Sequence, residues 1–95
     1  MGKYKRVMLK LSGEALAGDK HTGFDLATVE AVAKEVKQAV DEGTEIAVVI
    51  GGGNFWRGRT GNEIDRVKSD QIGMLATVMN ALYVSEVFRT NGMQT

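Results

Sequence analysis

The chain has 95 residues, with 12 basic and 12 acidic side chains and therefore no formal net charge. A chain of this length makes at most one domain and buries about 60–65% of its unfolded surface. The charge balance excludes long-range attraction to nucleic acid or to a membrane, so we expect neither partner. The absence of cysteine excludes disulfides and thiolate metal sites, and we expect a cytoplasmic protein.

The first element expected is a β-strand over residues 5–11, with Val7-Met8-Leu9 as its apolar part and Lys10 near its carboxyl end. Residues 12–24 contain three glycines and several polar side chains. That composition predicts a long loop, or a loop with one short turn of helix.

A helix and a second strand follow. Asp25 is a suitable N-cap, apolar residues then recur at helical spacing as far as Val40, and Gly43 falls where a left-handed helix terminus is expected. Residues 45–50 contain the almost unbroken apolar run Ile-Ala-Val-Val-Ile. Such a run is typical of a parallel strand that is buried on both faces.

The last part of the chain predicts a long helix. Residues 55–68 are polar and read as a loop, with room for one short helix. The long helix begins at Ser69 with Asp70 in its first turn, and Asn91-Gly92 ends it. Its apolar residues form two stripes, so we expect burial on both sides. One stripe is Ile72, Leu75, Ala76, Met79, Leu82, Tyr83 and Val87; the other is Met74, Val78, Ala81, Val84 and Phe88.

Two parallel strands joined by a helix form a β-α-β unit, whose strands end at the same edge of the sheet. Ligands of open α/β sheets bind at that edge, where backbone amides face the crevice. Here it would gather Lys10, Gly13, the glycines 51–53 and Arg57. A lysine, an arginine and several glycines favour an anionic ligand, and most of all a phosphate. The residues alone also allow a ligand-free tight turn, a surface lysine and a solvated arginine.

Three runs of the sequence together resemble bacterial uridylate (UMP) kinases, which belong to the amino-acid kinase superfamily. The resemblance covers essentially the whole chain but only the amino-terminal part of the family's domain. It implies an α/β fold, the amino-terminal β-α-β portion of a three-layer α/β/α domain with a mainly parallel sheet, in which residues 1–95 are part of one longer domain. The runs are VMLKLSGEAL (7–16), VVIGGGNFWRG (48–58) and MLATVMN (74–80).

The resemblance also implies an activity, the transfer of a phosphoryl group from ATP to UMP. Carried over by position, Lys10, Leu11, Ser12, Gly13, Gly53 and Arg57 would contact ATP, with Lys10 as the catalytic residue, and Gly52 and Asp70 would bind UMP. Mg²⁺ would accompany ATP, although no ligands for it are identifiable in this chain. The family forms hexamers and responds to GTP and UTP, and residues 18–23 fall where its GTP-responsive loop lies.

The residue types suit this chemistry. Phosphoryl transfer depends on positioning and charge stabilisation, which a lysine point charge, an arginine fork and glycine amides supply. The acceptor is already ionised, since the second pKa of a phosphate monoester is about 6. An ionised aspartate such as Asp70 accepts hydrogen bonds from ribose hydroxyls, although a charge near a helix start is its commoner role. Two alternatives stay open: a non-catalytic nucleotide-binding or oligomerisation fragment, and a relative that acts on another acceptor.

Overall fold

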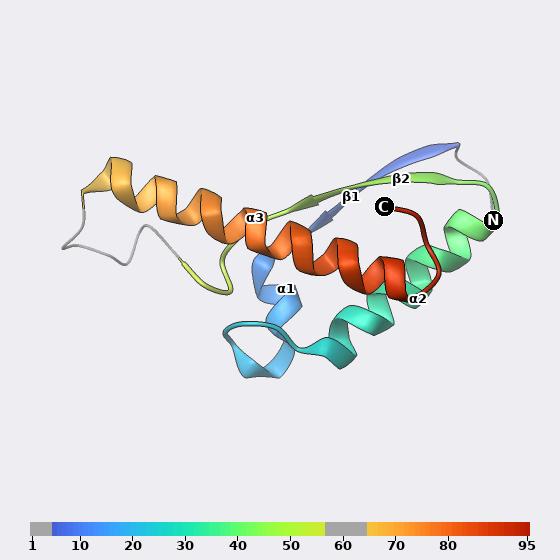
Figure 1. Ribbon diagram of the computed structural model, residues 1–95, viewed down its shortest axis with the longest axis horizontal. Helices are drawn as coiled ribbons and strands as arrows, with labels where there is room; N and C mark the ends of the chain where they lie inside the picture. Colours follow the sequence, from blue (N-terminus) through green and yellow to red (C-terminus); the bar gives the residue numbers. More distant parts are fainter. Residues whose placement is uncertain (1–4, 57–64) are drawn as a thin grey trace.

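The computed structural model describes residues 5–56 and 65–95 as a β-α-β unit that is followed by a long helix (Figure 1). Strands β1 (Arg6–Leu11) and β2 (Glu45–Ile50) pair in parallel, from Arg6 opposite Glu45 to Leu11 opposite Ile50. The short helix α1 (Gly13–Ala17), the 3-10 helix η1 (Gly18–Lys20) and helix α2 (Leu26–Asp41) connect them, and α3 (Arg66–Thr90) comes last. The α/β class and the parallel pairing predicted from the sequence are confirmed.

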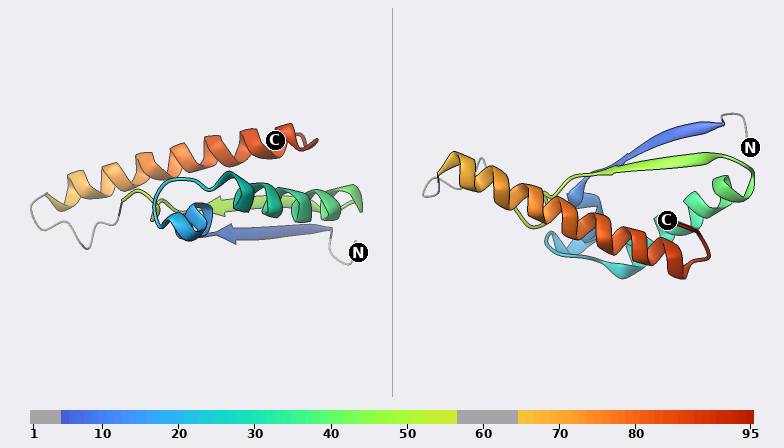
Figure 2. Two further views of the ribbon diagram at one scale, coloured as in Figure 1. Left: turned by 90° about the horizontal axis from the view of Figure 1, so that it is seen from below. Right: turned by 45° about the horizontal axis from the view of Figure 1, so that its top comes forward.

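The two strands present one face to the helices. Val7, Leu9 and Leu11 alternate with exposed neighbours along β1, and Ile46, Val48 and Ile50 do the same along β2. Figures 1 and 2 show α2 and α3 on the same side of the strands. On the other face Met8 is 71% and Val49 46% exposed. The described residues therefore supply the sheet and one helical layer of the expected three-layer domain, and they cover one strand face rather than both.

Helix α2 has the expected limits. Asp25 precedes it with an extended backbone, although its carboxylate accepts a hydrogen bond from the Thr28 hydroxyl and does not cap a backbone amide. Gly43, just past the helix, has a φ of 99°, a left-handed conformation that favours glycine. The helix thus ends close to the start of β2, which keeps the crossover between the strands short.

Helix α3 begins earlier than predicted. It begins at Arg66, where Asp65 accepts hydrogen bonds from the amides of Val67 (3.1 Å) and Lys68 (3.4 Å). The prediction of a start at Ser69 was wrong because the first turn contains one apolar residue, Val67, which is too few to show a helical period. Asp70 consequently lies in the second turn, beyond the first-turn position that was expected for it. The predicted end at Asn91-Gly92 is confirmed, with Gly92 at a φ of 96°.

The core lies between the helices and the inner face of the sheet. Partly buried strand residues, with Phe24, Val32 and Tyr83, pack around it. The buried apolar side chains of this core are Leu16, Val29, Ala33, Val36, Val84, Val87, Phe88 and Met93. Only one side of α3 takes part, through residues of both predicted stripes. None of the helices in the described ranges is long and apolar enough to cross a membrane.

The other side of α3 carries large apolar side chains that the described residues do not cover. They are between 37% and 69% exposed: Ile72, Met74, Leu75, Val78, Met79 and Leu82. The expectation that α3 is buried on both sides is therefore not met within this part of the chain. The apolar pattern marked these positions correctly as contact residues, but sequence periodicity does not say which body supplies the contact.

Candidate functional site

Both strands deliver their carboxyl ends to the same edge of the sheet. Leu11 and Ile50 are paired in the register, and the amide of Gly51 donates to the carbonyl of Leu11 over 3.2 Å. The segments that begin at Ser12 and at Gly51 therefore start side by side. This is the arrangement at which open parallel sheets bind ligands.

The two segments approach so closely that Gly13 has no room for a side chain. A Cβ added at Gly13 would lie 2.4 Å from the Gly53 nitrogen and 2.9 Å from the Gly52 carbonyl carbon. A Cβ added at Gly53 would lie 2.8 Å from the nearer carboxylate oxygen of Glu14. The Gly13 contact explains why small residues follow both strands, and it brings backbone rather than side chains to the sheet edge.

The glycine loop, which we define as residues 51–56, also packs against α3. A Cβ on Gly52 would lie 3.0 Å from the carbonyl oxygen of Gly73 and 3.0 Å from the Ala76 Cβ. The amides of Phe55 and Trp56 both donate to the Gly52 carbonyl over 3.1 Å, which closes the loop as a turn. The α3 surface, with a glycine and an alanine at the contact, thus admits the loop backbone.

The three residues at the end of β1 and just after it, Lys10, Leu11 and Ser12, differ in what they present at this edge. Lys10 is exposed on the uncovered face of the sheet, one residue before the strand ends. Leu11 turns its side chain toward the core, so that it offers only backbone at the edge. The Ser12 hydroxyl accepts the Ala15 amide at 3.1 Å and so caps α1. The short helix predicted as one option for this loop is therefore present.

Asp70 and Arg57 stand apart from these residues. Asp70 is exposed in the second turn of α3, one turn before Gly73, and its carboxylate lies 3.7 Å from the Arg66 guanidinium. The helix thus brings Asp70 to the neighbourhood of the glycine loop without a direct contact to it among the described interactions. Arg57, a predicted ATP contact, lies outside the described residues.

Sequence reasoning missed a pair of buried amides beneath the loop. Asn54 is 2% and Asn80 is 0% exposed, and their side-chain amides hydrogen-bond each other. A signal for Asn80 was present, because it is an amide on the helix face that otherwise carries Ala76, Val84 and Val87. A buried amide needs a partner, which the polar residue after the glycines supplies.

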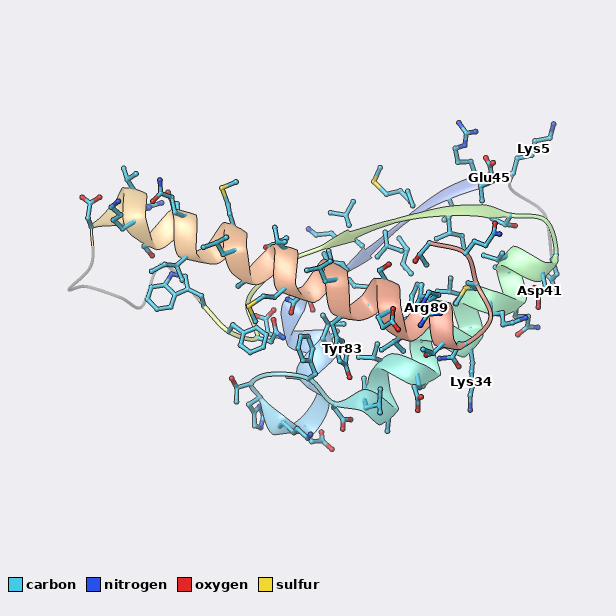
Figure 3. The ribbon with its side chains drawn as sticks, viewed as in Figure 1. Lys5, Lys34, Asp41, Glu45, Tyr83 and Arg89 are labelled. Carbon is cyan, nitrogen blue, oxygen red and sulfur yellow. The ribbon has the colours of Figure 1, made fainter. Side chains whose placement is uncertain are left out.

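An aromatic cluster borders the loop on the side of α1. The ring of Phe24 stacks on Tyr83 at 3.8 Å and meets Phe55 edge-on at 5.3 Å. Figure 3 shows Tyr83 reaching from α3 toward the segment that joins α1 to α2. Burial, with smaller contributions from the carboxylates of Glu30 and Asp25, raises the pKa of the Tyr83 phenol above its usual 10.0. Tyr83 is thus a neutral packing residue near pH 7.

Trp56 is a packing residue as well. Its indole Nε1 donates to the buried hydroxyl of Ser69 over 2.9 Å, and a Cβ on Gly73 would lie 3.7 Å from its ring. The indole therefore fastens the end of the glycine loop to the first two turns of α3.

The described residues do not fit a protein-held metal ion. Across residues 5–56 and 65–95, no three His, Cys, Asp or Glu side chains gather closely enough to hold one.

Comparison with known proteins assigns the family. Residues 5–95 match the amino acid kinase family, and the chain belongs to it. It is 55% identical over 95 residues to a uridylate kinase of Streptococcus thermophilus and 53% identical to one of Pediococcus pentosaceus. Each alignment covers 98% of this chain and 39% of the relative. The chain thus spans about two fifths of the length of these relatives.

Solved structures show the same fold. The UMP kinase of Bacillus anthracis superposes with a TM-score of 0.84 at 45% identity, covering 92% of this chain and 36% of that one. The UMP kinase of Ureaplasma parvum gives a TM-score of 0.85 at 27% identity, covering 98% and 42%. The resemblance inferred from the three sequence runs is therefore confirmed, as is the α/β fold class.

The close approach of the two segments predicts unequal effects of alanine at their glycines. In the protein that carries this chain, Gly13→Ala should destabilise the fold by about 1–3 kcal/mol, because the new Cβ meets backbone that has to move. Gly51→Ala is the matched control, since its nearest neighbour would lie 3.7 Å away and its φ is not positive. Urea unfolding measures both, and equal effects of the two variants would contradict the described contact.

Proposed function

We propose that the protein carrying this chain is a phosphotransferase that moves the terminal phosphoryl group of ATP to UMP and so forms UDP. The observation that carries the proposal is the close packing of Gly13 against Gly52 and Gly53 at the carboxyl edge of a parallel sheet. Membership of the amino acid kinase family and the similarity to uridylate kinases support the reaction class and the acceptor.

The residues at the carboxyl edge of the sheet are assigned to the two nucleotides. Lys10, Leu11, Ser12, Gly13, Gly53 and Arg57 are assigned to ATP, and Gly52 and Asp70 to UMP. Backbone amides of the glycines approach phosphate oxygens without a Cβ between them. Lys10 lies one residue from the end of its strand, a rise of about 3.3 Å, which its four-carbon stem can span. Its ammonium group then compensates the negative charge on the phosphoryl group during transfer.

The reaction needs no general base from this part of the chain. The acceptor oxygen belongs to a phosphate monoester whose second pKa is about 6, so it is largely ionised at neutral pH. Catalysis then rests on alignment of the two nucleotides and on stabilisation of charge on the equatorial oxygens. Mg²⁺ bound to ATP would add positive charge at those oxygens, with ligands from outside the described residues.

The remaining proposals concern the whole protein. We infer that residues 1–95 form the amino-terminal part of one longer amino-acid-kinase domain, that the protein is cytoplasmic, and that GTP and UTP act as effectors. Coverage of only 39% of the aligned uridylate kinases supports the first of these. The effectors rest on the family resemblance alone.

We further propose a homo-oligomer, a hexamer by family resemblance, in which α3 meets a second copy of itself. The uncovered apolar side of α3 extends over residues 72–82, about 15 Å of helix. Its two charged termini flank an apolar middle, with Arg66 and Lys68 at one end and Glu86 and Arg89 at the other. A two-fold contact pairs such a strip with itself, which is the commonest way to bury it.

Replacement of Lys10 tests the catalytic assignment. In the protein that carries this chain, Lys10→Ala should lower the turnover of ATP and UMP about 100-fold or more, the usual cost of removing one group that stabilises transition-state charge. Lys34→Ala is the control, because Lys34 is exposed on α2 and points away from the sheet (Figure 3). A coupled assay of UDP formation measures both, and near-normal turnover of Lys10→Ala would refute the role.

An acceptor panel separates the alternatives. UMP should be the preferred acceptor over carbamate and acetylglutamate. Preference for another acceptor would indicate a different member of the family, and nucleotide binding without transfer would indicate a non-catalytic protein.

Replacement of Leu75 tests the oligomer. Leu75 is 66% exposed at the centre of the apolar strip, so Leu75→Glu should place a charge in the proposed contact and shift the mass in light scattering to a smaller species. Gln38→Glu, the same charge on exposed α2, should leave the mass unchanged. An unchanged mass for Leu75→Glu together with lost stability would show instead that the chain's own domain covers this strip.

A further inference from the structure

Two buried asparagines beneath the glycine loop form a closed arrangement of hydrogen bonds. The Asn80 amide nitrogen donates to the Asn54 side-chain oxygen over 2.7 Å, and the Asn54 amide nitrogen donates back to Asn80 over 3.2 Å. Asn54 belongs to the loop and Asn80 to the middle of α3. The pair therefore joins the loop to the helix by side chains, in addition to the backbone contact at Gly52.

Each amide uses its second hydrogen on a backbone carbonyl. Asn80 donates to the Gly51 carbonyl over 2.7 Å, and Asn54 donates to the Gly23 carbonyl over 2.8 Å. All four amide hydrogens therefore have acceptors, and each side-chain oxygen accepts from the other amide. Rotation of either amide by a half-turn would set an oxygen against a carbonyl oxygen, so the arrangement has one orientation only.

The Asn54 backbone extends the arrangement to a third segment. Its carbonyl accepts from the Gly23 amide over 3.1 Å and from the Thr22 hydroxyl over 2.9 Å. The glycine loop is thus fastened both to α3 and to the segment before α2. Such a network is costly when one member is missing and rigid when every member is paired.

The bond to Gly51 sets the direction of a peptide group in the proposed nucleotide site. In a trans peptide the carbonyl oxygen of Gly51 and the amide hydrogen of Gly52 point in opposite directions. Because Asn80 holds the carbonyl toward α3, the Gly52 amide points away from the helix. A carbonyl turned the other way would present its oxygen to a phosphate and repel it, whereas the amide attracts it.

We propose that Asn54 and Asn80 are positioning residues, which hold the glycine loop with its Gly52 amide directed at the nucleotide. The proposal rests on the proposed function of the loop as a nucleotide site. Neither side chain touches a nucleotide, since both are buried behind the loop. They act through the Gly51 and Gly23 carbonyls.

The test replaces Asn80 in the protein that carries this chain. Asn80→Asp keeps the shape but sets an oxygen against the Gly51 carbonyl, and Asn80→Ala removes the side chain without adding a charge. Asn91→Asp is the control, because the Asn91 amide donates to the Val87 carbonyl over 2.8 Å at the far end of the same helix. The measurements are kcat and KM for ATP and UMP, hydrogen exchange of residues 51–56, and urea unfolding.

We expect both Asn80 variants to raise KM for at least one nucleotide about tenfold, to lower kcat/KM by more than that, and to speed exchange at residues 51–56 about tenfold. Asn91→Asp should stay within about twofold of the wild type in each. If Asn80→Asp fails to fold, the kinetics and exchange of Asn80→Ala test the proposal. Lost stability with wild-type kinetics and wild-type exchange in the loop would overturn the proposal. A wild-type protein without phosphoryl transfer would overturn the proposed function, while the exchange data would still show whether Asn80 holds the loop.

Discussion

The contact on which the rest of this structure depends is the approach of the Gly13 backbone to Gly53, at a separation that admits no side chain. It exists because β1 and β2 are parallel neighbours that end in register at Leu11 and Ile50. A helical crossover is the usual way to make such neighbours, and α2 provides it. The result is an edge lined by peptide groups, which suits a ligand that is recognised by its oxygens.

The two sides of helix α3 make different contacts. One side seals the core and receives the glycine loop, through Ala76, Asn80 and Val84 among others. The opposite side keeps six large apolar side chains exposed, which within a folded protein calls for a partner or for more of the same domain. The uncovered face of the sheet at Met8 and Val49 likewise calls for a partner or for more of the same domain. The described part of the chain therefore has one inner core and two outer surfaces suited to contact.

The strands and α2 could be predicted from the sequence because their signals are local. The apolar run 45–50 gave β2 its observed limits, and Gly43 gave the turn after α2. The start of α3 could not be found in this way, since Val67 is the one apolar residue of its first turn and a single residue shows no helical period. The exposure of Leu75 and Met8 was hidden for another reason, because periodicity identifies apolar positions and not what covers them.

The residues of the candidate site also fall into two groups, those that could be predicted from local sequence and those that could not. Lys10, Gly13 and the glycines 51–53 were placed at one edge by the β-α-β pattern alone, and the structure brings Gly13 and Gly53 into contact. The pairing of Asn54 with Asn80 depends on how α3 lies across the loop, over a separation of 26 residues. No local pattern carries that information. What the sequence does contain is an amide, Asn80, within an apolar face of a helix, and this indicates that a partner is needed.

The most direct measurement is hydrogen exchange across the protein that carries this chain, with and without saturating ATP or UMP. The account predicts that exchange slows at residues 11–16 and 51–56 together, because both segments meet the same nucleotide phosphates, while the outer turn of α2 around Lys34 is unchanged. Slowing at only one of the two segments, or at neither while nucleotide binds elsewhere, would contradict a shared phosphate site at the edge of the sheet.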